Sequence, residues 1–303
     1  MEKIIVKIRN GFGNKIFNLI IGLYLKKVNG GELYLWIEKS SHENNTDPTI
    51  ADFFPKLNNY YNVIASKDEL SSYYNSEHLK FKCFKVKNID GFKLNIKEKI
   101  ILLFDCSFCY KFTYEIFNLL DDEIKNKFSI NKKLIAKDIL DISKQKYACI
   151  HIRYGDKLHL SINMNQFYYL LYTPKFYKYI INKLLKKNIN IYIITDDIKI
   201  VNKYILNDIN TQNIHLLNTN WWDSFYVLAN ARHCVLSIST FSFLACMINK
   251  HLRLAYVVVR PKDIQKYSTS EEIIIYNTPW YKKDNKRFIL NYDMDLMKKM
   301  SLR

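Results

Sequence analysis

Short apolar runs that predict buried strands alternate with helically spaced runs along most of the 303-residue chain. The strand patterns are KIIVKI (3–8), ELYLWI (32–37), EKIILLFDCSFC (98–109), YACIHI (147–152), INIYIIT (189–195) and CVLSIS (234–239). The helical patterns occupy residues 15–30, 121–142, 173–187 and 241–249. Strands that alternate with helices favour parallel sheets made of βαβ units, so the sequence predicts the α/β class.

The alternation falls into two series that meet near residues 135–145. A chain of this length exceeds the usual size of one domain. We therefore predict two Rossmann-like domains that face each other across a cleft, with 1–140 as the N-terminal and 141–303 as the C-terminal domain. Weak periodicity over 40–95 predicts only loops and short elements there.

The formal net charge of +17 admits nucleic acid, an anionic membrane or a phosphorylated small molecule as partners. The lysines are scattered, however, and no interleaved basic and aromatic motif of the RNA-recognition kind occurs, so we expect no nucleic acid partner. A non-catalytic, basic polyanion-binding protein remains an alternative function.

The six cysteines predict a reduced protein with structural thiols. Cys149, Cys234 and Cys246 have apolar neighbours and predict core positions, while Cys106 and Cys109 form a single CxxC without further zinc ligands. The amino terminus lacks a secretory signal pattern, and the apolar runs fall short of the ~20 residues of a transmembrane helix. We expect a soluble, cytoplasmic protein.

The segment CIHIRYGDKL (149–158) places charged groups where a buried strand ends. Side chains two apart on a strand share one face, so His151 and Arg153 lie on the same side. A cationic cluster at a strand end predicts that an anion binds there.

Glycines follow the first strand in the segment NGFGNKIF. Gly11 and Gly13 lie between a strand and its helix, where α/β folds bind ligands, although a tight turn alone would also explain them. Asn14 could simply cap the helix. The chain has neither GxGxxG nor GxxxxGK[ST], so neither a dinucleotide fingerprint nor a P-loop is predicted.

Two further strand ends carry polar groups. The segment SIST brings three hydroxyls, with Ser239 and Thr240 at a helix start, which favours phosphate over simple capping. Asp196 and Asp197 end the strand IYIIT; one could cap the next helix, and the other could bind a nucleobase, a ribose or a metal.

Five segments, in order, are GFGNKIFN, HIRYGD, YTPKFYKYI, IYIITDD and WDSFYVLANARHCVLSISTFSFLACMI. They resemble the α-1,2-fucosyltransferase family (glycosyltransferase family 11-like), whose pattern runs GxGNQxFQ, HxRRGD, a helix with YY, FSDD and SxSTFSWWAA. The resemblance extends from about residue 8 to NTPWYKK near 280. It implies a GT-B fold and a metal-independent, inverting transfer of fucose from a GDP-fucose donor to a glycan acceptor, without a cofactor.

The resemblance also implies roles in the second domain. Arg153 would contact the β-phosphate and stabilise the charge on the leaving GDP, with Asp156 holding the turn or orienting Arg153. His151 would lie beside Arg153 as a further catalytic residue, and a satisfied strand histidine is the alternative. Ser239, Thr240 and the N–H of Phe241 would complete the phosphate site.

Other roles implied by the resemblance concern the base, the sugar and the acceptor. Asp196 or Asp197 would face the guanine or the ribose, and Gly11, Gly13 and Asn14 would approach the sugar and the acceptor. Asp105, at a strand end, is the only candidate general base.

The chain departs from the family pattern at positions that flank the expected site. Lys15 replaces glutamine, Tyr154 the second arginine, Ile238 the asparagine of SNSTF, and Phe243 and Leu244 the tryptophan pair. Another GDP-sugar or another linkage therefore remains an alternative.

Overall fold

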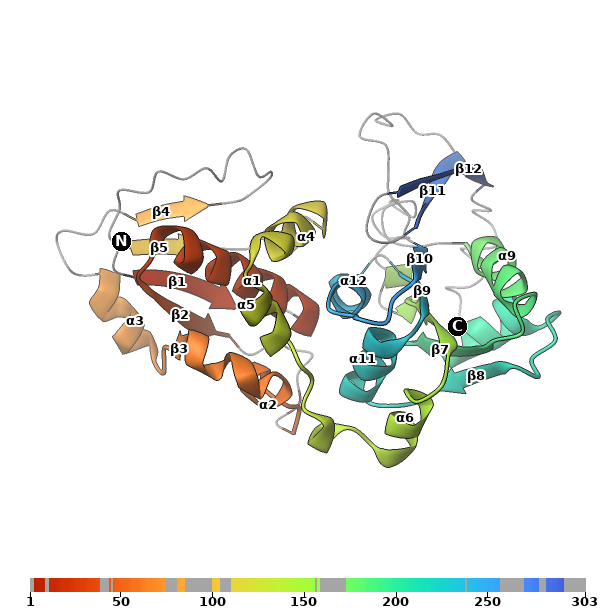
Figure 1. Ribbon diagram of the computed structural model, residues 1–303, viewed down its shortest axis with the longest axis horizontal. Coiled ribbons are helices and arrows are strands. Elements are labelled where there is room, and N and C mark those ends of the chain that lie inside the picture. Colours follow the sequence, from red (N-terminus) through yellow and green to blue (C-terminus); the bar gives the residue numbers. More distant parts are fainter. Residues whose placement is uncertain are drawn as a thin grey trace. The chain divides into compact units, whose positions relative to one another are not determined.

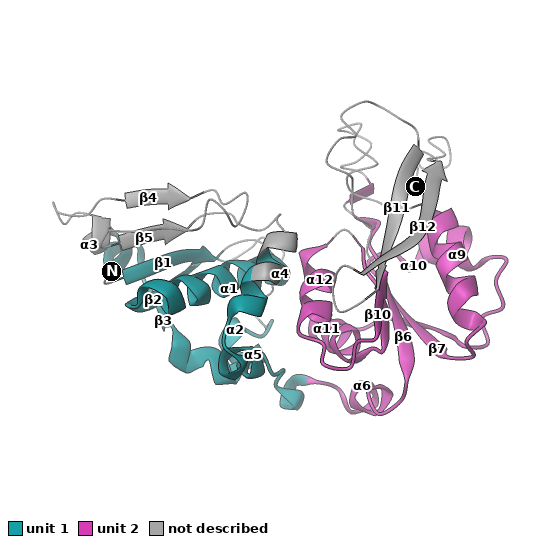
Figure 2. Ribbon diagram, turned by 45° about the horizontal axis from the view of Figure 1, so that its top comes forward, with its two compact units in different colours: residues 1–134 teal, residues 135–303 magenta. Residues whose placement is uncertain are grey.

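The computed structural model describes residues 3–8, 11–38, 44, 46–74, 81–84, 100–103, 110–155, 157–158, 173–237, 239–256, 270–277 and 282–291. The chain divides into two compact units, Met1–Leu134 (unit 1) and Ile135–Arg303 (unit 2), which Figure 2 distinguishes by colour. Both units are α/β, so the predicted fold class is confirmed.

Unit 1 is built on a five-stranded parallel sheet with the order β3-β2-β1-β5-β4 (Figure 1). Its elements are β1 Lys3–Ile8, α1 Phe12–Asn29, β2 Glu32–Ile37, α2 Ile50–Phe53, a 3-10 helix Pro55–Tyr60, β3 Asn62–Val63, α3 Lys67–Tyr74, β4 Phe81–Phe84, β5 Ile100–Leu103, α4 Tyr110–Leu119, α5 Asp122–Lys127 and a 3-10 turn Lys132–Leu134. The sheet departs from the Rossmann order only in its last two strands, which have exchanged places.

Helix α1 packs closely on this sheet. A Cβ atom added at Gly22 would lie 2.7 Å from Val6 Cγ2 and 2.9 Å from Leu33 Cδ1, so glycine allows the helix to approach β1 and β2. The close approach holds the first turn of α1 beside the carboxyl end of β1.

Unit 2 has a five-stranded parallel sheet with the order β10-β9-β6-β7-β8 and a separate antiparallel pair, β11 and β12. Its elements are α6 Lys137–Ile142, β6 Tyr147–Ile152, α9 Pro174–Leu185, β7 Asn190–Thr195, α10 Ile198–Ile200, a π-helix Val201–Leu206, β8 Ile214–Leu217, α11 Trp221–Asn230, β9 His233–Val235, α12 Thr240–Met247, β10 Leu254–Tyr256, β11 Ser270–Asn277 and β12 Lys282–Asn291. Counted from β6, the parallel order is that of the Rossmann fold.

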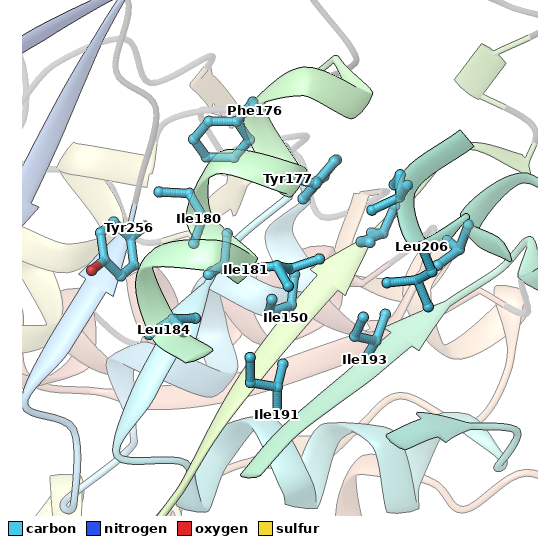
Figure 3. Close-up of a cluster of buried hydrophobic side chains, with 14 of the residues drawn as sticks. Ile150, Phe176, Tyr177, Ile180, Ile181, Leu184, Ile191, Ile193, Leu206 and Tyr256 are labelled. Carbon is cyan, nitrogen blue, oxygen red and sulfur yellow. The ribbon is translucent and has the colours of Figure 1, made fainter. Parts of the chain in front are cut away.

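Strand β6 is the central strand of this sheet, and all six of its residues are buried. Ala148, Ile150 and Ile152 belong to the apolar cluster that includes α9 (Figure 3). The alternate residues face the other way, where the hydroxyl of Tyr147 donates to the carbonyl of Val227 in α11 (2.8 Å). Helices on both faces explain why all six residues of the strand are buried.

The single helix predicted over 121–142 is wrong, because the structure has α5, a 3-10 turn and α6 there. The backbone N–H of Asn131 donates to the carbonyl of Phe53 (3.0 Å), and that of Ala136 donates to Asp223 Oδ1 (3.0 Å). Partners distant in sequence therefore take donors that a continuous helix would have used.

Other predicted elements are present with shifted ends. The helix predicted from residue 15 begins at Phe12, and the strand predicted over 234–239 is β9, which ends at Val235. The buried thiols of Cys149, Cys234 and Cys246 occupy the predicted core positions, whereas Cys106 and Cys109 lie outside the described residues. Among the helices that the structure describes, none is both long and apolar enough to span a membrane.

Candidate functional site

Three predicted polar clusters in unit 2 follow adjacent strands of the parallel sheet. Arg153 follows β6, Asp196 follows β7, and Ser237 and Ser239 follow β9, with β6 between the other two. The carboxyl ends of parallel strands meet at one edge of the sheet. The chain runs outward from β6 to β7 and β8 and then returns to β9, so β6 and β9 form the topological switch point where such sheets bind ligands.

Arg153 extends from this edge toward the start of α12. The side chain is half-buried, and its Nη1 donates to Ser239 Oγ at 3.4 Å. The guanidinium thus lies at the positive end of the α12 dipole, beside backbone N–H groups of the first helical turn. Both features favour an anion at this position.

Ser239 is the N-cap of α12. Its buried Oγ accepts from the backbone N–H of Phe241 (3.3 Å) as well as from Arg153, while Thr240 is half-buried in the first turn. Capping therefore engages Ser239 and the Phe241 N–H, both of which the sequence analysis assigned to phosphate. A bound phosphate would have to compete with this cap or extend it.

His151 lies on the same face as Arg153, as the strand period predicts, but it is buried. Its Nδ1 is 2.7 Å from Ser237 Oγ, and its ring is 5.6 Å from that of Phe241. Burial lowers the pKa of His151 to about 3, and the charge of Arg153 acts in the same direction. Near neutral pH His151 is therefore uncharged, and its Nδ1 contacts the hydroxyl of Ser237.

We expect His151 to make folding sensitive to acid. The folded-state pKa of about 3 lies below the ordinary 6.5, so below pH 6.5 the unfolded state binds a proton that the folded state does not. The free energy of unfolding should then fall by ~1.4 kcal/mol for each pH unit between those values. Denaturant unfolding at pH 7, 6, 5 and 4 measures this slope.

The matched variant is His151→Gln, which keeps a polar side chain next to Ser237. The slope of its free energy of unfolding against pH should be lower by ~1.4 kcal/mol per pH unit, which is the contribution of one proton. Equal slopes in the two proteins would show that His151 takes up its proton in the folded state.

Ser237 is a site residue whose partner the sequence did not reveal. It was counted among the hydroxyls for phosphate, but its Oγ contacts His151 and lies 3.5 Å from Ser242 Oγ. Ser242 in turn contacts the carbonyls of Ser237 and Ser239 (3.4 and 3.3 Å). These hydroxyls link the end of β6 to the start of α12.

The two aspartates after β7 have different surroundings. Asp197 is buried and caps α10, since its Oδ1 accepts from the N–H of Ile200 (3.0 Å). Asp196 is exposed, and its Oδ1 accepts from the backbone N–H groups of Tyr154 (2.9 Å) and Gly155 (3.1 Å). Asp197 is therefore the capping member of the pair, and Asp196 lies at the turn after Arg153.

The glycine segment of unit 1 follows β1, which is flanked by β2 and β5 at the switch point of that sheet. Gly11 is the N-cap of α1, with open space where a Cβ atom would be. Gly13 is buried, and the Asn14 N–H donates to the Gly11 carbonyl (3.0 Å). Asn14 lies inside the first turn and is not the cap.

Asp105 and Asp156, predicted as base and as turn support, lie outside the described residues, as does Ile238. Within the part of the chain that is described, no group of three or more His, Cys, Asp or Glu side chains could hold a metal ion.

Comparison with protein families gives a match to "Glycosyl transferase family 11" over residues 103–281, more than half of the chain. A comparison with curated proteins found no match.

Solved structures give a likeness in fold. A NodZ α-1,6-fucosyltransferase co-crystallised with GDP is 11% identical with a TM-score of 0.51, over 96% of this chain and 99% of that one. POFUT1 in complex with GDP-fucose is 12% identical with a TM-score of 0.50, over 82% of this chain and 95% of that one. A Bradyrhizobium NodZ structure is 11% identical with a TM-score of 0.47, over 86% and 95%. At these identities the likeness concerns the fold alone.

Proposed function

Because this chain belongs to glycosyl transferase family 11, we propose that it transfers fucose from GDP-fucose to a hydroxyl group of a glycan. The observation that carries the proposal is the contact between Arg153 and Ser239 at the switch point of unit 2. A guanidinium beside a helix N-terminus suits a pyrophosphate, whose charge grows as the glycosidic bond breaks. Arg153, Ser239, Thr240 and the N–H of Phe241 are the proposed phosphate ligands.

The choice of donor also has support from the fold neighbours, whose structures contain GDP or GDP-fucose. We propose that unit 2 holds the nucleotide and that the N-terminal domain, 1–140, serves the acceptor through Gly11, Gly13 and Asn14. Asp105 is the proposed general base and Asp156 a support of the turn. We propose inversion and an α-1,2 linkage on the basis of the resemblance in sequence, and another GDP-sugar or linkage is the alternative.

A guanine contact is proposed for Asp196 alone. The Asp197 carboxylate is buried in the cap of α10, whereas the side chain of Asp196 is exposed. A carboxylate can accept from the N1–H and N2–H groups at the edge of guanine, and uracil has no such pair of donors.

We expect GDP to raise the melting temperature of the protein and UDP to leave it nearly unchanged. A ligand at about 100 times its dissociation constant adds ~2.7 kcal/mol to the free energy of unfolding. For a chain of this size that corresponds to a shift of a few degrees. Thermal denaturation with each nucleotide, at equal ionic strength, measures it.

Equal shifts with GDP and UDP would remove the guanine contact from the proposal. No shift with either would favour the alternative of a basic polyanion-binding protein, which the net charge of +17 allows. Binding of a polyanion would then fall steeply with salt concentration.

We also propose that transfer requires no metal, because a guanidinium and helix N–H groups can stabilise the leaving diphosphate. Release of GDP from GDP-fucose should therefore proceed at the same rate in excess EDTA and in added Mg²⁺. Loss of activity in EDTA that Mn²⁺ or Mg²⁺ restores would assign a metal to the carboxylates instead.

A further inference from the structure

We infer that Asp196 is a positioning residue for Arg153: it fixes the turn after β6 and so directs the guanidinium toward the diphosphate. This inference rests on the proposed function and adds a residue that acts through Arg153. A contact with guanine alone would leave Arg153 unaffected.

The first support is the pair of hydrogen bonds to one carboxylate oxygen. Asp196 Oδ1 accepts from Tyr154 N–H at 2.9 Å and from Gly155 N–H at 3.1 Å. The N–H of Tyr154 shares its rigid peptide plane with the carbonyl of Arg153. An acceptor on this N–H therefore restrains the backbone of Arg153, and the second bond restrains the next peptide plane.

The second support is the register of β6 with β7. Ile152, the last residue of β6, is paired with Thr195, the last residue of β7, so Arg153 and Asp196 directly follow paired strand ends. The aspartate thus reaches its acceptor position from a fixed, buried strand. The side chain of Tyr154 is fully buried and its ring lies edge-on to that of Tyr177 (6.1 Å), which holds the far side of the turn.

The third support is the absence of a side chain at Gly155. A Cβ atom there would lie 2.6 Å from Asp196 Oδ2 and 2.9 Å from its Cγ. The carboxylate therefore packs directly against the glycine, and any larger residue would displace it. The motif YGD places this glycine two residues after the arginine.

Together these contacts leave the Arg153 side chain anchored at both ends. Its backbone lies between the end of β6, which is paired with β7, and the turn whose N–H groups donate to Asp196. Its Nη1 donates to Ser239 Oγ. Removing the carboxylate frees two amides and lets the arginine move from its position, and a displacement of about 1 Å can cost about 100-fold in rate.

The test combines five single variants with a double mutant. Asp196→Ala should slow GDP release from GDP-fucose by about 100-fold and weaken both GDP and IDP. IDP lacks the 2-amino group that the guanine contact would use, so the loss that the two nucleotides share is the part that passes through Arg153. Asp196→Asn should keep kcat within about fivefold of that of the unchanged protein, since its amide oxygen can accept both backbone N–H groups. Loss of the carboxylate contact with guanine should fall on the affinity for GDP instead. Gly155→Ala should resemble Asp196→Ala while keeping the carboxylate.

The decisive measurement is the double mutant. In the Arg153→Ala background, Asp196→Ala should lower the rate by less than about threefold, because its effect passes through the arginine. Asp208→Ala is the matched control, since this exposed aspartate pairs with Lys178 (2.7 Å) and comes before β8, at the amino end of that parallel strand. The rate of this variant should equal that of the unchanged protein.

The inference is overturned if Asp196→Ala lowers the rate by the same factor with and without Arg153. It is also overturned if Asp196→Ala and Asp196→Asn weaken GDP equally and leave the affinity for IDP unchanged. If Asp196→Ala does not fold, the contrast between Asp196→Asn and Gly155→Ala decides, and equal rates in those two overturn the inference. If the unchanged protein binds no GDP, the proposed function fails and the inference fails with it. If GDP binds and Arg153→Ala weakens it while Asp196→Ala does not, the inference alone fails.

Discussion

Replacement of Arg153 by alanine is expected to lower the rate of GDP release from GDP-fucose by about 100- to 1,000-fold. Arg153 is the cation at the switch point of unit 2, 3.4 Å from the hydroxyl that caps α12. A preorganised donor to the charge that develops on the diphosphate acts mainly in the transition state. The loss should therefore fall on kcat more than on the affinity for the donor.

Arg153→Lys should also lose most of the activity, because an ammonium group cannot make the paired contacts of a guanidinium. Arg253→Ala is the matched control, since this exposed arginine comes directly before β10, at the amino end of that parallel strand. The melting temperatures of all three variants should stay close to that of the unchanged protein. Near-normal GDP release by a folded Arg153→Ala protein would remove Arg153 from the site.

Ile180→Ala is expected to lower the free energy of unfolding of unit 2 by about 2–5 kcal/mol. Ile180 is fully buried on α9, in the apolar cluster that packs against β6 and β7 (Figure 3). The truncation removes apolar contacts and leaves a cavity within this cluster. Denaturant unfolding followed by circular dichroism measures the change.

The control is Lys175→Ala, at an exposed position near the start of the same helix. It should change the free energy of unfolding by less than about 0.5 kcal/mol. Similar losses in both variants would mean that α9 contributes through its helix propensity and not through burial.

Local patterns predicted β6, α9, β7, β9 and α12 of unit 2, but not β8, α11 or β10. The apolar run at 147–152 and the helically spaced run at 173–187 became β6 and α9, because a parallel strand and an amphipathic helix need only neighbours of the right polarity. Thr173 and Pro174 begin α9 as a cap and a first-turn proline, which are also local signals.

Long-range contacts explain where that reasoning failed. The run at 121–142 has a helical pattern, yet its backbone N–H groups at Asn131 and Ala136 find partners at Phe53 and Asp223. No local pattern contains such partners, so a helix continued across them was predicted.

For the candidate site, the sequence was enough to place polar groups at the ends of strands, because residue type and strand period are local properties. It also predicted that His151 and Arg153 lie on one face, because side chains two residues apart on a strand point to the same side.

Which of these strand ends are neighbours depends on the order of the strands, and that order follows from how the helices pack on both faces of the sheet. With β6 between β9 and β7, Ser237 meets His151 and Ser239 meets Arg153. Asp196 meets the turn after Arg153, and Asp197 is buried in a helix cap. The sequence alone does not distinguish the two adjacent aspartates, and their different roles arise from their contacts. Asp196 accepts from a backbone N–H more than forty positions away. Asp197 accepts from one in the next helical turn.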